Sequence, residues 1–219
     1  MLMRFAATVG GFTMLSRLLG FARDILIALF LGASAVGDAF FVSFKLPNLF
    51  RRLFAEGAFN LAFVPLFTDV LTAQGRTTAR AFAEDALSVL LWVLLVVVAL
   101  AQIAMPWLML LIAPGFSDDP AKFDLTVYLA RLTFPYLLFI SLVSLLSGLL
   151  NSLDRFAAAA AAPVLLNLCL IGSLLVFARV GQTPAHALAW GVAAAGVLQL
   201  LWLAWNCKRA KILPRLPSP

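Results

Sequence analysis

Long apolar segments alternate with short polar turns along the whole chain. Six of these segments are long enough to cross a bilayer as helices, which takes about 20 residues at 1.5 Å per residue. They cover about residues 4–31, 37–69, 82–113, 125–150, 157–177 and 187–205. Because the apolar runs are continuous, and longer than the roughly ten alternating residues of a barrel strand, the pattern predicts an all-α fold. We expect a polytopic membrane protein with six transmembrane helices in residues 1–207 and a basic tail in residues 208–219.

Composition supports the membrane assignment and narrows the possible functions. With 63% hydrophobic residues, 12% charged residues and a mean hydropathy of +1.03, the chain lies outside the range of soluble domains. The net charge of +6 does not indicate nucleic-acid binding, because the basic residues lie at or inside the spans. The sequence has no Walker loop, hydrolase elbow or metal-ligand motif, and its one histidine, His186, is expected at a helix start. We therefore predict neither an enzyme nor a metal or cofactor site.

The distribution of lysine and arginine predicts the orientation. With six spans, one side of the membrane holds most of the basic residues of the turns and ends: Arg4, Arg76, Arg80, Arg155, Lys208, Arg209, Lys211 and Arg215. The other side holds only Lys122 and Arg179. Since short cytoplasmic loops carry the excess of positive charge, both termini are expected in the cytoplasm and the acidic loop at Asp118 outside.

The first span carries charges that a simple membrane anchor would avoid. On an ideal helix Arg17 and Asp24 lie on nearly one face with Gly20 between them, while Arg23 points about 120° away. The helix therefore has a wide polar sector, in which Gly20 leaves room for a close approach. One interpretation is a purely structural pair of Arg17 with Asp24, although that pair leaves Arg23 unexplained.

The second span is also charged. On an ideal helix one stripe contains Asp38, Lys45, Arg52 and Glu56, with Arg51 roughly opposite. Pro47 removes a backbone donor, so we expect the helix to kink or break there, which would shift the phase of the stripe. Periodicity therefore cannot choose between Arg51 and Arg52 as the residue that faces a cavity. Either arginine could also extend to lipid headgroups at the cytoplasmic surface.

The arginines predict an anionic ligand. An arginine or lysine at the centre of a spanning helix costs roughly 2.5–3.5 kcal/mol, and the usual reason for several of them is a shared water-filled cavity. The planar guanidinium group can donate two parallel hydrogen bonds to a phosphate or carboxylate. Because phenylalanine, leucine and alanine surround these charges, an amphiphile with an anionic head, such as a phospholipid or a polyprenyl phosphate, fits best.

Several long motifs carry a family resemblance. In order, they are SRLLGFARD, GDAFFVSFKLPNLFRRLFAEGAFNLAFVP, APGF before an acidic loop, TFPYLLFISLVSLLSGLLNSLDRF and APVLLN. Together they resemble the bacterial lipid II flippase MurJ (MviN) family of the multidrug/oligosaccharidyl-lipid/polysaccharide exporter superfamily. The resemblance implies transport of lipid II, the undecaprenyl-pyrophosphate-linked peptidoglycan precursor, by alternating access. The direction would be from the inner to the outer leaflet of the bacterial cytoplasmic (inner) membrane.

The resemblance also implies site residues. The family's functional arginines correspond to Arg17, Arg23 and Arg51, which would bind the pyrophosphate, with Asp38 as an associated acidic position. Supporting positions in or near the same motifs are Asp24, Gly20, Lys45, Arg52 and Glu56.

The chain resembles only the N-terminal six-helix lobe of a fourteen-helix exporter fold. Residues 208–219 would then lead toward a missing C-terminal lobe, and we expect the chain alone to be an incomplete flippase that does not transport. The alternative is a membrane scaffold or assembly subunit whose intramembrane charges pair with the helices of a partner. A transporter needs its arginines open to a cavity, whereas a scaffold needs them paired with carboxylates.

Overall fold

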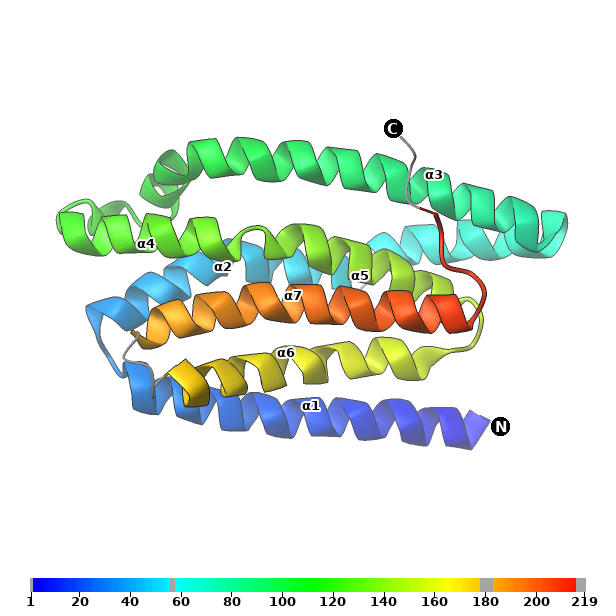
Figure 1. Cartoon of the computed structure of the whole chain (residues 1–219), viewed down its shortest axis with the longest axis horizontal. Coiled ribbons are helices and arrows are strands. Elements are labelled where there is room, and N and C mark those ends of the chain that lie inside the picture. Colours follow the sequence, from blue (N-terminus) through cyan, green and yellow to red (C-terminus); the bar gives the residue numbers. More distant parts are fainter. Residues whose placement is uncertain (1, 56–57, 178–182, 216–219) are drawn as a thin grey trace.

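The computed structural model describes residues 2–55, 58–177 and 183–215, without the side chains of 2–6, 51–55, 58–60 and 177. In these residues it contains helices and no strand, as predicted. The elements are α1 (Leu2–Leu31), α2 (Ala35–Ala55), α3 (Ala58–Ile112), the short 3₁₀ helix η1 (Pro114–Phe116), α4 (Pro120–Thr133), α5 (Tyr136–Asn151), α6 (Phe156–Phe177) and α7 (Pro184–Arg209). The helices lie side by side in one bundle, with α1 at one edge beside α6 and the later part of α3 at the opposite edge (Figure 1).

The positions of the helices and of the turns between them can be compared with the predicted spans. Helix α3 changes direction at Gly75, whose φ of 81° and ψ of 176° are accessible to glycine at little cost, and this confirms the predicted turn. Helices α4 and α5 follow one another across Phe134 and Pro135. Four segments of the described chain are long and apolar enough to cross a membrane: Leu61–Ile112, Pro120–Asn151, Phe156–Val176 and Pro184–Arg209. The charged helices α1 and α2 lie in the same bundle, which confirms an all-α polytopic architecture.

A tight turn joins α1 to α2. Gly32 has a φ of 55°, the left-handed conformation in which helices commonly end. Two residues later the Ser34 hydroxyl accepts a hydrogen bond from the Gly37 N–H at 3.1 Å and so caps α2. Asp38 falls in the first turn of α2, where a negative charge is favoured by the helix dipole.

Of the kink or break expected at Pro47, the break is wrong, because α2 stays helical through that residue. A proline leaves the carbonyl four residues earlier without its helical N–H partner, and here that carbonyl belongs to Ser43. The Thr133 hydroxyl at the end of α4 donates a hydrogen bond to it at 3.2 Å. Both Ser43 and Thr133 are buried. A side chain from a neighbouring helix thus replaces the missing donor, which is one way in which membrane helices tolerate proline.

Two further prolines are compensated by a reciprocal pair. Pro106 in α3 frees the Gln102 carbonyl, which accepts a hydrogen bond from Arg131 Nε at 3.3 Å. Pro135 frees the Arg131 carbonyl, which accepts from Gln102 Nε2 at 2.8 Å. Arg131, an intramembrane arginine of the fourth span, therefore has a role between α3 and α4. It does not line the cavity described below.

Removing the Thr133 hydroxyl should measure this compensation. We expect Thr133→Val to lower the free energy of unfolding by about 1 kcal/mol, because the buried Ser43 carbonyl loses its donor. Thr126→Val is the matched control, since Thr126 is also buried in α4 but bonds to the Lys122 carbonyl of its own helix. The measurement is reversible unfolding in mixed detergent micelles. Adding Pro47→Ala should restore the N–H donor and cancel most of the loss; an equal loss in that background would contradict the explanation.

Helix α5 forms the centre of the bundle, with nearly all of its side chains buried. Its first residue, Tyr136, donates a hydrogen bond at 3.1 Å to Gln199 of α7, which in turn donates at 2.7 Å to the Ala162 carbonyl of α6. Glycines allow close packing at this level. A Cβ atom built on Gly196 of α7 would lie 2.9 Å from ring carbons of Tyr136 and Phe139. These contacts leave α1 at the edge, attached mainly through α6.

The first part of the predicted basic tail packs against the bundle. Residues 210–215 turn from the end of α7 toward α3, as Figure 1 shows. Ile212 is buried, and the backbone N–H of Arg215 donates to Glu84 Oε1 of α3 at 2.9 Å. The same carboxylate oxygen accepts from Arg80 Nε at 3.1 Å. The Glu84 carboxylate thus ties this segment to α3, while Ile212 is buried in the apolar core of the bundle.

Candidate functional site

A cavity of about 370 Å³ lies between α1, α2 and α6. Its polar wall comes mainly from α1, through Arg17, Arg23 and Asp24, with the amides of Asn48 from α2 and Asn167 from α6. Its apolar wall includes three phenylalanines of α2: Phe40, Phe41 and Phe44. The cavity therefore combines guanidinium groups with aromatic surface, as expected for an amphiphilic anion.

Arg23 is held in place by two neighbours. Its Nε and Nη2 atoms donate to Asp24 Oδ1 at 3.0 and 2.7 Å, and its Nη1 atom donates to Asn167 Oδ1 at 2.8 Å. The side chain of Arg23 is 25% exposed and that of Asp24 is 65% exposed. Arg23 thus faces the cavity with part of its hydrogen-bonding capacity already used.

Arg17 differs from Arg23 in having no hydrogen bond or ion pair within the described residues. It is exposed on the cavity wall, one turn from Gly20, which also lines the cavity. The structural pair of Arg17 with Asp24 does not form, because Asp24 accepts from Arg23 instead. Of the side chains that the structure describes, the cavity therefore contains one restrained and one unrestrained guanidinium group.

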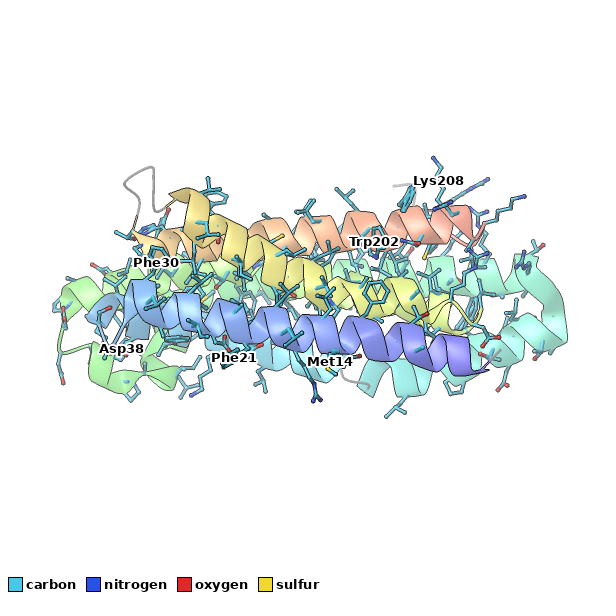
Figure 2. The ribbon with its side chains drawn as sticks, turned by 90° about the horizontal axis from the view of Figure 1, so that it is seen from below. Met14, Phe21, Phe30, Asp38, Trp202 and Lys208 are labelled. Carbon is cyan, nitrogen blue, oxygen red and sulfur yellow. The ribbon has the colours of Figure 1, made fainter. Side chains whose placement is uncertain are left out.

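Asp38 lies away from this cavity. Its carboxylate accepts a hydrogen bond from Lys122 Nζ of α4 at 2.7 Å, and Lys122 also lies 4.0 Å from the centre of the Phe116 ring. Figure 2 shows Asp38 at the end of the bundle opposite to Lys208. The structure thus groups Asp38 with η1 and the start of α4 rather than with the arginines.

The remaining charged candidates belong to the second span. Lys45 is exposed, does not line the cavity, and has no hydrogen bond or ion pair among the described side chains. The backbone of Arg51 and Arg52 continues α2, but their side chains lie outside the described part of the chain. Glu56 lies outside the described residues altogether.

Asn167 is the main site residue that sequence reasoning missed. It is 5% exposed and connects two helices, since its Nδ2 atom donates to the Ser16 carbonyl at 2.9 Å while its Oδ1 atom accepts from Arg23. A single amide within the apolar run of the fifth span was the available signal. Asn48 and Ser16 gave still weaker signals, because short polar side chains are common in membrane helices.

The geometry distinguishes the two functions that the sequence left open. A scaffold would need its arginines paired with carboxylates, yet among the described residues Arg17 has no such partner and lines the cavity. Arg23 has a carboxylate partner but also lines the cavity. The arrangement therefore favours binding of an anion over purely structural pairing.

Fold and cavity together define a helical multi-pass membrane protein with a cationic, partly aromatic cavity between its helices. A family model described as "Lipid II flippase MurJ" matches residues 27–218, and the chain belongs to this family. It is 51% identical over 216 residues to a probable lipid II flippase MurJ of Rhizobium tropici, covering 97% of this chain and 40% of that protein. It is 42% identical over 213 residues to the lipid II flippase MurJ of Burkholderia cenocepacia, covering 97% of this chain and 41% of the relative.

A solved structure agrees with the fold. The structure of a lipid II flippase MurJ in an inward closed conformation matches with a TM-score of 0.77 and 24% identity, over 96% of this chain and 43% of that one. The chain spans about 40% of the length of the curated relatives named above.

Proposed function

We propose that this chain forms the N-terminal part of the substrate cavity of a lipid II flippase, with the substrate pyrophosphate bound by Arg17, Arg23 and Arg51. The observation that carries the proposal is Arg17, which lies on the cavity wall beside the restrained Arg23 and has no ion pair within the described part of the chain. The test is transport of lipid-linked precursor by a full-length flippase that contains this lobe with one arginine replaced. Loss of transport at a normal protein level is the expected result.

The position of Arg51 is supported by the helix period. Phe41, Phe44 and Asn48 of α2 line the cavity at intervals of three and four residues. The next positions on that stripe are 51 and 52, because α2 remains helical to Ala55. An arginine at this point would extend the cationic wall along α2.

The cavity has guanidinium groups on one wall and phenylalanine rings on another, and this arrangement suits a lipid-linked pyrophosphate. Guanidinium groups match the phosphate oxygens, while Phe40, Phe41 and Phe44 offer apolar surface beside them. Asp38 has no such match, since a carboxylate repels phosphate and is bound to Lys122 here. Its direct contact with substrate stays a prediction from the family resemblance.

We further propose residence in the bacterial inner membrane with both termini in the cytoplasm, and alternating access together with a second lobe. The start of α1 and the end of α7 lie at the same end of the bundle, which supports this orientation (Figure 1). The clustering of lysine and arginine at that end supports it as well.

Cysteine labelling tests the orientation. In a variant without Cys169 and Cys207, we expect an impermeant thiol reagent to label a cysteine at position 118 from outside and to miss one at position 155. Asp118 and Arg155 are both exposed, so the difference reports the side of the membrane rather than burial. Permeabilised cells, in which both positions should react, are the control. Labelling at position 155 alone would reverse the topology.

A further inference from the structure

The hydrogen bonds of Asn167 define which part of Arg23 is free. A guanidinium group has five N–H donors, and an asparagine side chain has one acceptor oxygen and one donor nitrogen. Arg23 uses three donors: one on Nε and one on Nη2 to Asp24, and one on Nη1 to Asn167. Within the described part of the chain two N–H groups remain without a partner, one on each terminal nitrogen. This is the number needed for a bidentate bond to a phosphate.

The orientation of the Asn167 amide follows from its partners. Arg23 can only donate and the Ser16 carbonyl can only accept, so only one of the two amide orientations satisfies both. In that orientation Oδ1 meets Arg23 at 2.8 Å and Nδ2 meets the Ser16 carbonyl at 2.9 Å. Because Asn167 is 5% exposed and anchored to the α1 backbone, it cannot turn away without losing a buried hydrogen bond.

The local packing leaves space for this arrangement. Gly20 lies between Ser16 and Arg23 along α1, and a Cβ atom there would lie 3.6 Å from Asn167 Nδ2. A methyl group would only touch the amide, whereas a larger side chain would push it away from α1. The amide therefore sits directly against α1 between its two partners, and it restrains Arg23 from a different helix.

We propose that Asn167 is a positioning residue that acts through Arg23. It holds the guanidinium so that the two free N–H groups on Nη1 and Nη2 present a preformed fork to a phosphate group of the substrate. Asp24 holds the edge of the same guanidinium that is formed by Nε and Nη2. The inference rests on the proposed function, because it requires that Arg23 bind the substrate pyrophosphate. It gives Asn167 of α6 a role beside the proposed pyrophosphate-binding arginines of α1 and α2.

A double-mutant cycle tests the proposal. The 219-residue chain in nanodiscs is titrated with undecaprenyl pyrophosphate, with undecaprenol as the probe that lacks phosphate. We expect Asn167→Ala to weaken pyrophosphate binding about tenfold, the loss associated with one charge-assisted hydrogen bond. Arg23→Ala should weaken it at least as much. Adding Asn167→Ala to Arg23→Ala should cause no further loss, because a positioning residue has nothing left to position.

Controls separate positioning from folding. Asn206→Ala removes a half-buried asparagine of α7 that bonds within its own helix and lies outside the cavity, so its affinity should match that of the original chain. The thermal midpoint is measured for every variant. Asn167→Asp keeps the shape and the acceptor for Arg23, loses the donor to the Ser16 carbonyl and adds a negative charge beside Arg23. We expect weaker pyrophosphate binding than in Asn167→Ala. A merely structural residue would not produce this charge-dependent order at equal thermal midpoints.

The outcomes are distinguishable. Unchanged affinity in Asn167→Ala, or an equal further loss in the Arg23→Ala background, would overturn the positioning role while leaving the anion site in place. Unchanged affinity in Arg23→Ala, or equal binding of undecaprenol, would overturn the proposed function and the positioning role together. Losses that follow the thermal midpoint alone would assign Asn167 to the packing of α1 on α6.

Discussion

Alanine at position 17, 23 or 51 of a full-length flippase that contains this lobe should abolish or sharply reduce transport of the lipid-linked precursor. Protein level should stay normal for Arg17→Ala, because Arg17 has no carboxylate partner among the described residues. Removing an unpaired charge from a membrane helix should, if anything, favour insertion by roughly 2.5–3.5 kcal/mol. Transport and protein level are measured together in cells depleted of their own flippase.

Lysine substitutions refine this test. Lysine restores the charge without the planar fork, so it should rescue transport only in part. Arg76→Ala is a suitable control, since Arg76 is exposed beside the turn at Gly75 and outside the cavity. Normal transport in all three alanine variants, or transport that falls only in proportion to protein level, would contradict the anion site. A structural ion pair predicts the second pattern, because a lost partner costs roughly 3–5 kcal/mol when the pair is buried.

A large effect on folding is expected at Gly196. A Cβ atom there would lie 2.9 Å from Cδ2 of Tyr136 and of Phe139, and 3.0 Å from Phe139 Cβ. Tyr136 is fully buried and bonded to Gln199, so it cannot move aside cheaply. We expect Gly196→Val to destabilise the bundle by about 3 kcal/mol or more and to reduce the yield of folded protein.

The matched control for this prediction is Gly172 in α6. A Cβ atom at Gly172 would have no neighbour within 4 Å, so Gly172→Val should leave the yield and the thermal midpoint nearly unchanged. Size-exclusion chromatography in detergent and thermal unfolding give both quantities. Equal behaviour of the two valine variants would show that α5 and α7 can separate at this level without loss of the fold.

Much of the architecture could be predicted because membrane insertion imposes a strong local pattern. Continuous apolar runs identified the four segments that are long and apolar enough to cross a membrane, and Gly75 marked the turn within α3. The cost of charge in a membrane also singled out Arg17 and Arg23, which do line the cavity. These features depend on residues close together in sequence.

The errors and omissions involve residues far apart in sequence. Helix α2 continues through Pro47, and the carbonyl of Ser43 that this proline frees accepts a hydrogen bond from Thr133, 90 residues away. The ion pair of Asp38 with Lys122, 84 residues away, had no signal in the sequence. Asn167 is 144 residues from Arg23. Periodicity places a side chain on a face of its own helix, and only the packed bundle determines which neighbour that face meets.

Three of the proline-freed carbonyls, those of Ser43, Gln102 and Arg131, make certain substitutions interdependent during evolution. Arg131 and Gln102 each supply the donor that the other's proline-freed carbonyl requires, and Thr133 does the same for Ser43. A relative that loses Pro106 no longer needs a donor at position 131, and one that loses Pro47 no longer needs a hydroxyl at position 133. The prolines and their donors should therefore be inherited, or replaced, together.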